Sequence, residues 1–195
     1  MKLYLTESSG NAYKVRLMLG LLGVPYEKVL LDFPNKEHKQ PAYLKISPRG
    51  QVPALQDGEH VFWDSSACLV YLARKFGSEA WLPTAPAAMA EVMQWVALAG
   101  NEVQYGLQYG RGILKGIRQG DLAGCQAIGR IALDTLESRL KDHHWLALDR
   151  PTIADVANYP YVALAHEAEL PLDGYPGIRG WLKRLEALPQ WTSRG

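Results

Sequence analysis

The chain up to residue 31 changes its hydrophobic spacing twice. Apolar side chains cluster at 2–5 and 26–31, in segments short enough to predict two strands. Between these segments, from Ala12 onward, apolar residues recur three and four positions apart, which predicts an amphipathic helix. Gly23 and the proline that follows it end this helix. Strand, helix and strand in this order predict a βαβ unit with parallel strands.

A β-hairpin is predicted further along the first half of the chain. Apolar runs at 54–56 and 61–63 flank the pair Asp57-Gly58. Both central positions of a tight hairpin turn favour such residues, because these residues tolerate positive φ. Pro53 precedes the first run, where a missing backbone N–H does little harm to a strand. The hairpin therefore adds two antiparallel strands to the predicted sheet.

A second helix is predicted from residue 65 to about residue 75. Asp64, Ser65 and Ser66 stand at its start, and their side chains can accept hydrogen bonds from the free N–H groups of a first helical turn. The positive end of such a helix also holds a carboxylate well. With one more short helix near residue 44, the chain predicts a small mixed sheet with helices on both faces.

The remainder of the chain predicts helices only. Prolines and small residues make 78–86 a linker between two predicted domains, 1–77 and 87–195. Thr152 and Asp155 have the spacing of a capping box, a signal for the start of a helix. Apolar spacing predicts helices over 87–119, 122–141, 153–168 and 178–188. The predicted fold class is therefore α/β plus all-α.

Composition and charge exclude several classes of function. The net charge of +1, with 21% charged and 48% apolar residues, favours neither nucleic acid nor an anionic membrane as a partner. No apolar run reaches the roughly 18 residues that a transmembrane helix needs. Cys68 and Cys125 lack CxxC spacing and suit a reducing compartment, so a cytoplasmic location is expected. The five histidines have no metal-ligand spacing, so no metal is predicted.

Three motifs, in order and at suitable separations, resemble the soluble glutathione transferases. Val52-Pro53 resembles that family's Val-Pro loop, whose proline is cis, and Asp64-Ser65 stands where the family has Glu-Ser or Asp-Ser. Residues 152–156 resemble its capping box. The resemblance covers nearly the whole chain, and it implies a thioredoxin-like N-terminal domain followed by an all-helical C-terminal domain.

The segment 8–16 is most similar to the serine-type classes of this family, namely theta, zeta and their bacterial relatives. The resemblance implies that a hydroxyl near the start of the first helix donates to the glutathione thiol and favours the reactive thiolate. Ser9 is the expected donor, and Asn11 and Ser8 are alternatives. Another interpretation is that these residues only cap the helix.

The resemblance also implies the other contacts to glutathione. Asp64 and Ser65 are expected to hold the γ-glutamyl end, and the backbone of Val52, before Pro53, is expected to pair with the cysteinyl part. His38 and Gln51 match positions near the glycyl carboxylate. The candidates for lining a co-substrate pocket between the domains are Asn101, Glu102, Tyr105 and Tyr109.

Two further charges near this loop, Lys39 and Arg49, are interpreted as surface charges. The predicted function is that of a cytoplasmic, homodimeric glutathione transferase with a role in detoxification. Its thiolate would attack a small, largely apolar electrophile. The alternatives are a glutathione-dependent isomerase and a glutathione-binding or regulatory protein without turnover.

Overall fold

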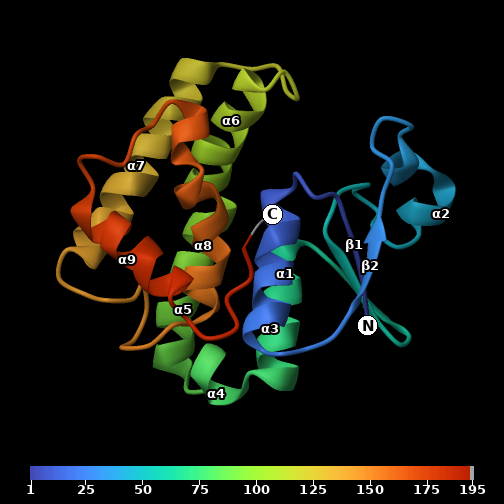
Figure 1. Cartoon of the computed structure of the whole chain (residues 1–195), viewed down its shortest axis with the longest axis horizontal. Helices are drawn as coiled ribbons and strands as arrows, with labels where there is room; N and C mark the ends of the chain where they lie inside the picture. The colour runs from blue at the N-terminus through green and yellow to red at the C-terminus, as the bar shows by residue number, and fades with distance from the viewer. Residues whose placement is uncertain (194–195) are drawn as a thin grey trace. The chain divides into compact units, whose positions relative to one another are not determined.

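The computed structural model describes residues 1–193 and divides the chain into two compact units (Figure 1). The first unit contains Met1–Ser78 together with the C-terminal segment that begins at Pro189, and the second contains Glu79–Leu188. The predicted second domain ran to the end of the chain, whereas the structure groups this last segment with the first unit. The Tyr13 hydroxyl donates to the carbonyl of Thr192 at 2.8 Å, which ties the segment to the first helix.

The first unit is built on a four-stranded mixed sheet of order β2-β1-β3-β4. β1 is parallel to β2 and antiparallel to β3, and β3 is antiparallel to β4. The predicted strands and helices are thus present, in the predicted order. Their bounds are β1 Lys2–Leu5, α1 Gly10–Leu21, β2 Glu27–Leu30, a 3₁₀ turn Glu37–Lys39, α2 Pro41–Leu44, β3 Ala54–Asp57, β4 His60–Trp63 and α3 Ser65–Phe76.

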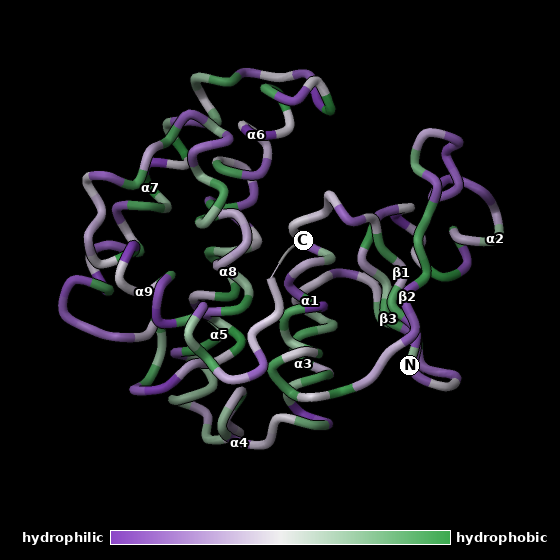
Figure 2. Tube along the Cα trace, viewed as in Figure 1, coloured by the Kyte–Doolittle hydropathy of each residue, from purple (hydrophilic) through white to green (hydrophobic). Residues whose placement is uncertain are grey.

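The core of this unit follows the period of each element. Leu3 and Leu5 of β1 are fully buried, as the period of two in a strand requires. α1 packs against α3 and buries Val15 and Met18, and α3 buries Leu69. Figure 2 shows hydrophobic residues along α1, α3 and the strands, with hydrophilic residues more frequent in the connecting loops.

The hairpin turn differs from the prediction by one residue. Asp57 pairs with His60 in the ladder, so the two turn residues are Gly58 and Glu59. Only Gly58 has positive φ, at 60°. Glycine at the first central position alone is typical of a type II′ turn, whereas the prediction from Asp57-Gly58 assumed positive φ at both positions.

The second unit is helical throughout its regular structure. The predicted helix 87–119 is interrupted at Asn101, whose φ of −113° and ψ of −98° are not helical. A π-helical segment follows, and its Gly106 touches Gly129 so closely that a Cβ there would lie 2.3 Å from the Gly129 nitrogen. The bounds are α4 Ser78–Trp81, α5 Pro86–Gly100, a π-helix Val103–Gln108, α6 Tyr109–Leu114, α7 Leu122–Leu140, α8 Ile153–Ala163, a 3₁₀ turn Ala165–Ala168 and α9 Pro176–Glu186.

The capping box predicted at the start of α8 is confirmed. Asp155 accepts from the backbone N–H of Thr152 at 2.9 Å, and the Thr152 side chain accepts from the first turn of the helix. Asp155 also accepts from the N–H of Leu146 at 3.1 Å and from the indole N–H of Trp181 at 2.9 Å. One buried carboxylate therefore joins the helix start to two distant segments of the second unit.

Candidate functional site

The register of the sheet brings four loops of the first unit to one end. Leu5, the last residue of β1, pairs with Leu30, the last residue of the parallel strand β2. Tyr4 pairs with Ala54, the first residue of β3, and Ala54 pairs with Trp63, the last residue of β4. The chain therefore leaves β1, β2 and β4, and enters β3, at the same end of the sheet.

These four loops and the helix starts beside them carry all the residues of the first domain that were expected to contact glutathione. Ser9 and Asn11 follow β1, His38 follows β2, the segment 51–53 precedes β3, and Asp64 and Ser65 follow β4. Residues separated by more than fifty positions in the sequence are thus collected at one end of one sheet.

Ser9 is the N-cap of α1. Its hydroxyl oxygen accepts from the Ala12 N–H at 3.1 Å, so its hydroxyl hydrogen remains available for donation. Ser9 is half-buried at the positive end of a helix of three turns. Asn11 is half-buried in the first turn, and Ser8 is exposed. This arrangement places a hydroxyl donor where it would favour an anion.

The peptide bond between Val52 and Pro53 is cis, as the resemblance implied. The loop before it is fixed through the carbonyl of Gln51, which accepts from the Tyr43 hydroxyl at 2.8 Å and from the Ser47 hydroxyl at 3.0 Å. The structure records no hydrogen bond between the backbone of Val52 and any other residue of 1–193. The half-buried Val52 backbone is therefore available to pair with an extended ligand.

Lys39 is exposed, as expected, but it also joins two loops of this end of the sheet. Its ammonium donates to the carbonyl of Arg49 at 3.2 Å and to that of Gly50 at 3.1 Å. Gly50 has a φ of 55°, and a Cβ there would lie 2.6 Å from the carbonyl oxygen of His38. The sequence interpretation of Lys39 as a surface charge therefore missed a structural role.

His38 lies on the 3₁₀ turn Glu37–Lys39 and stacks on Phe33, with ring centroids 3.9 Å apart. Its Nδ1 is buried, without a hydrogen bond to the described part of the chain. Burial, with a smaller effect of Lys39, lowers the pKa of His38 from its ordinary value and so favours the neutral imidazole. Gln51, the other candidate for a ligand carboxylate, is exposed.

Asp64 is held in an unusual backbone conformation as the N-cap of α3. Its φ is 86°, a region that costs a residue other than glycine about 1–3 kcal/mol, and such residues concentrate at functional sites. Its Oδ1 accepts from the Ser66 N–H at 2.8 Å, while its Oδ2 faces Arg49 Nη1 at 3.7 Å. Ser65 is buried at the first position of the helix. One carboxylate oxygen thus caps the helix, while the other is held only by a long ion pair with Arg49.

Sequence reasoning overlooked Lys14, a cation in the buried face of α1. Its side chain is 2% exposed. Burial lowers its pKa to about 8, and the negative charge of Asp64 acts in the opposite direction. Lys14 falls among the apolar residues that predict this helix, and a charged residue at such a position was the signal that could have identified it. Lys14 therefore places a buried positive charge within electrostatic reach of Asp64.

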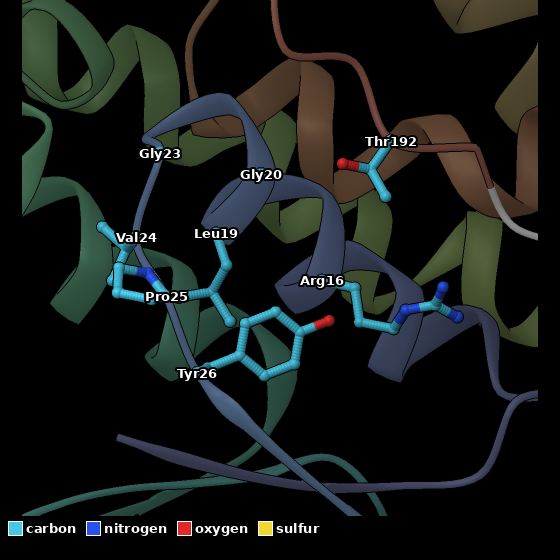
Figure 3. Close-up of a pocket in the computed structure, with 8 residues that line it drawn as sticks. All are labelled: Arg16, Leu19, Gly20, Gly23, Val24, Pro25, Tyr26 and Thr192. Carbon is cyan, nitrogen blue, oxygen red and sulfur yellow. The ribbon is translucent and has the colours of Figure 1, made fainter.

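A pocket of about 270 Å³ lies elsewhere in the first unit, where the C-terminal segment covers the end of α1 (Figure 3). Figure 3 shows Thr192 beside Gly20, where an added Cβ would lie 2.2 Å from the Thr192 hydroxyl oxygen. None of the predicted site residues lines this pocket. Its lining residues are Arg16, Leu19, Gly20, Gly23, Val24, Pro25, Tyr26 and Thr192. It is therefore distinct from the end of the sheet described above.

The co-substrate candidates lie on the helices that follow α5 in the second unit. Tyr105 and Tyr109 meet edge to face, with ring centroids 5.0 Å apart. The guanidinium of Arg118 lies 3.5 Å from the centroid of the Tyr109 ring. Asn101 instead donates to the carbonyl of Ala97, so it serves the end of α5. The aromatic pair with its cation is the part of this set that could bind a planar group.

Residues 1–193 contain no group of three or more His, Cys, Asp or Glu side chains that could hold a metal ion. No helix in the same part of the chain is both long and apolar enough to cross a membrane.

Comparison with known proteins identifies the family of both units. Residues 8–75 match the model of the glutathione S-transferase N-terminal domain, and residues 127–189 match that of the C-terminal domain. The chain is 32% identical to the maleylacetoacetate isomerase of Pseudomonas aeruginosa over 92% of its own length and 88% of that protein.

Solved structures agree with this similarity. A glutathione S-transferase from Pseudomonas fluorescens superposes with a TM-score of 0.91 and 30% identity, covering 99% of this chain and 98% of that chain. A glutathione transferase homologue from Drosophila mojavensis, solved with bound glutathione, superposes with a TM-score of 0.86 and 28% identity over 96% and 88% of the two chains. The chain belongs to the glutathione S-transferase family.

Proposed function

We propose that this glutathione transferase binds glutathione at the end of the first unit's sheet and activates its thiol there. The observation that carries the proposal is the register, which collects a hydroxyl donor, an unpaired peptide backbone and a carboxylate at one end of the sheet. These three groups match the thiol, the peptide backbone and the amino group of one small peptide.

Each group has a part of glutathione to contact. Asp64 accepts from the ammonium of the γ-glutamyl end, and Ser65 contacts the same end at the start of α3. The backbone of Val52 pairs with the cysteinyl part as a further strand would. His38 and Gln51 stand near the glycyl carboxylate. The exposure of Gln51 allows its amide to donate to that carboxylate from solvent.

The chemistry follows from the position of Ser9. Its hydroxyl donates a hydrogen bond to the sulfur, which favours the thiolate over the thiol while the proton leaves to solvent. The thiolate attacks an electrophilic carbon of a small, largely apolar co-substrate and forms a carbon–sulfur bond. Either a leaving group departs, or a double bond opens and its other carbon takes up a proton from solvent. Asn11 and Ser8 are the alternative donors, and both lie beside Ser9 at the start of α1.

An isomerase is the second candidate function, because one relative is named maleylacetoacetate isomerase. Transfer and isomerisation share the thiolate, but only isomerisation returns free glutathione at the end of each turnover. Following free thiol while an apolar aryl halide or a cis-dienoic acid is converted distinguishes them. Loss of thiol with the halide indicates transfer, and unchanged thiol with a converted acid indicates isomerisation. A glutathione-binding protein without turnover would convert neither.

We further propose that the protein acts in the cytoplasm as a homodimer. Its two cysteines suit a reducing compartment, since Cys68 is buried and Cys125 is half-buried, and both are free thiols. Light scattering at micromolar concentration is expected to give twice the chain mass of 21.7 kDa. A single-chain mass at that concentration would contradict the dimer.

Replacing Asp64 with alanine is expected to weaken glutathione binding about ten- to a hundredfold, since a hydrogen bond to a charged group contributes about 1.5–3 kcal/mol. Calorimetric titration of glutathione into each variant measures the change. Lys45→Ala is the matched control, because it removes one exposed charge from the same unit. We expect it to bind as the unaltered protein does. Equal losses in the two variants would show that the γ-glutamyl end lies elsewhere.

A further inference from the structure

The charge opposite Asp64 belongs to Arg49, which stands on the loop before β3. The two side chains are about half exposed, at 50% and 43%, and Arg49 Nη1 lies 3.7 Å from Asp64 Oδ2. This separation is too long for a hydrogen bond, and an exposed ion pair of this kind contributes little to stability. The pair therefore has no strong structural reason to persist when a better partner for either charge arrives.

Hydrogen bonds nevertheless hold the Asp64 carboxylate and the backbone of Arg49 in place. Asp64 is fixed by its N-cap bond from its Oδ1 to the Ser66 N–H at 2.8 Å, which leaves Oδ2 directed at Arg49. The backbone of Arg49 is fixed by the bond from Lys39 to its carbonyl at 3.2 Å, and by the Gly50 N–H, which donates to the Ser47 carbonyl at 2.8 Å. The loop and the helix start thus hold one cation and one anion side by side, and within residues 1–193 the Arg49 guanidinium has no recorded partner other than Asp64.

A ligand that carries only a positive charge would compete with the Arg49 guanidinium for Asp64. Its ammonium would have to displace the guanidinium from Asp64 and then remain close to it, at an electrostatic cost. A ligand that carries an ammonium and a carboxylate on one carbon would not meet this cost. Its binding replaces the long Arg49–Asp64 ion pair with two ion pairs, one between its ammonium and Asp64 and the other between its carboxylate and Arg49. The planar guanidinium is suited to a carboxylate, to which it can donate two parallel hydrogen bonds.

We propose that Arg49 is a specificity-determining residue that binds the α-carboxylate of the ligand, and that Arg49 and Asp64 together recognise the zwitterionic end of a γ-glutamyl peptide. The inference rests on the proposed binding of glutathione at this end of the sheet. It replaces the interpretation of Arg49 as a surface charge. The required ligand class is a peptide whose first residue has both a free α-amino group and a free α-carboxylate.

The test pairs two protein variants with two incomplete ligands. The 4-aminobutanoyl analogue of glutathione lacks the α-carboxylate, and the glutaryl analogue lacks the α-amino group. Arg49→Ala is expected to weaken glutathione binding about tenfold but to change binding of the 4-aminobutanoyl analogue by less than about threefold. Asp64→Ala should show the reverse selectivity, with a large loss for glutathione and a small one for the glutaryl analogue. Arg49→Lys should bind glutathione more tightly than Arg49→Ala but less tightly than the unaltered protein, because lysine keeps the positive charge but lacks the two parallel donors of the guanidinium.

Calorimetry on the full-length variants, with Lys45→Ala as the control for net charge, separates the outcomes. If Arg49→Ala binds glutathione as tightly as the unaltered protein or more tightly, Arg49 only competes with the ligand ammonium for Asp64, and the inference is overturned. Equal losses for glutathione and for the 4-aminobutanoyl analogue overturn it as well, because they indicate a disturbed loop. If the unaltered protein binds none of the three ligands, the proposed function itself fails, and the inference fails with it.

Discussion

Replacing Ser9 with alanine is expected to lower kcat/KM about ten- to a hundredfold near neutral pH. A hydrogen bond to a charged group contributes about 1.5–3 kcal/mol, and one pKa unit corresponds to about 1.4 kcal/mol. Loss of the bond to sulfur should therefore raise the pKa of the bound thiol by about one to two units. At a pH below the thiol pKa of both the unaltered protein and the variant, kcat/KM follows the fraction of thiolate. The loss of kcat/KM in Ser9→Ala is therefore largest there, and it becomes smaller as the pH rises.

The pH profile of kcat/KM separates this effect from a structural one. Ser9 also caps α1, and its replacement by alanine costs roughly 1 kcal/mol of stability at every pH. Ser9→Thr keeps both the hydroxyl and the cap, so it should retain most of the activity. Asn11→Ala and Ser8→Ala are the matched controls at the neighbouring positions. A profile shifted by Asn11→Ala and not by Ser9→Ala would assign the donor to the amide instead.

Replacing Asp155 with alanine is expected to destabilise the protein by about 3–5 kcal/mol, because each buried donor left unpaired costs about 1–3 kcal/mol. Asp155 is fully buried, and it accepts from Thr152, Leu146 and Trp181. Alanine would leave these donors without a partner in the interior. Urea denaturation measures the loss. Asp173→Ala, at an exposed position of the same unit, is the control and should change stability by less than about 0.5 kcal/mol.

The pH dependence of this loss has a definite sign. Burial raises the pKa of Asp155 from its ordinary value to about 6, although the donated hydrogen bonds act to lower it. A carboxyl whose pKa is raised on folding contributes its stability below the unfolded value, and that contribution is lost as the pH rises through the folded value. The cost of Asp155→Ala should therefore be greater at pH 4.5 than at pH 7. A cost that grows with rising pH would contradict the raised pKa.

The strands and helix starts could be predicted from sequence because short-range chemistry fixes them. The spacing around Val15 and Leu19 identified α1, and Thr152 with Asp155 identified the start of α8. Ser9 and Asp64 were identifiable for the same reason, because residues of their types cap helices and both are N-caps in the structure. The sheet then brought these local features together through its register.

The features that sequence did not predict depend on contacts between distant residues. Arg49 meets Asp64 only because β3 and β4 return to the same end of the sheet. Trp181 donates to Asp155 from a helix that starts more than twenty residues later in the chain. The interruption at Asn101 precedes a segment whose Gly106 lies against α7. None of these pairs leaves a periodic signal in the sequence, so local spacing could not reveal them.

The most direct test of the account is the absorbance of the thiolate when the unaltered protein, saturated with glutathione, is titrated against pH. If the end of the sheet binds and activates glutathione as proposed, the bound thiol should titrate at least about one unit below the value near 8.5 of a free thiol. A bound thiol that titrates as free glutathione does, with binding shown by calorimetry under the same conditions, would contradict the claim that this site activates it.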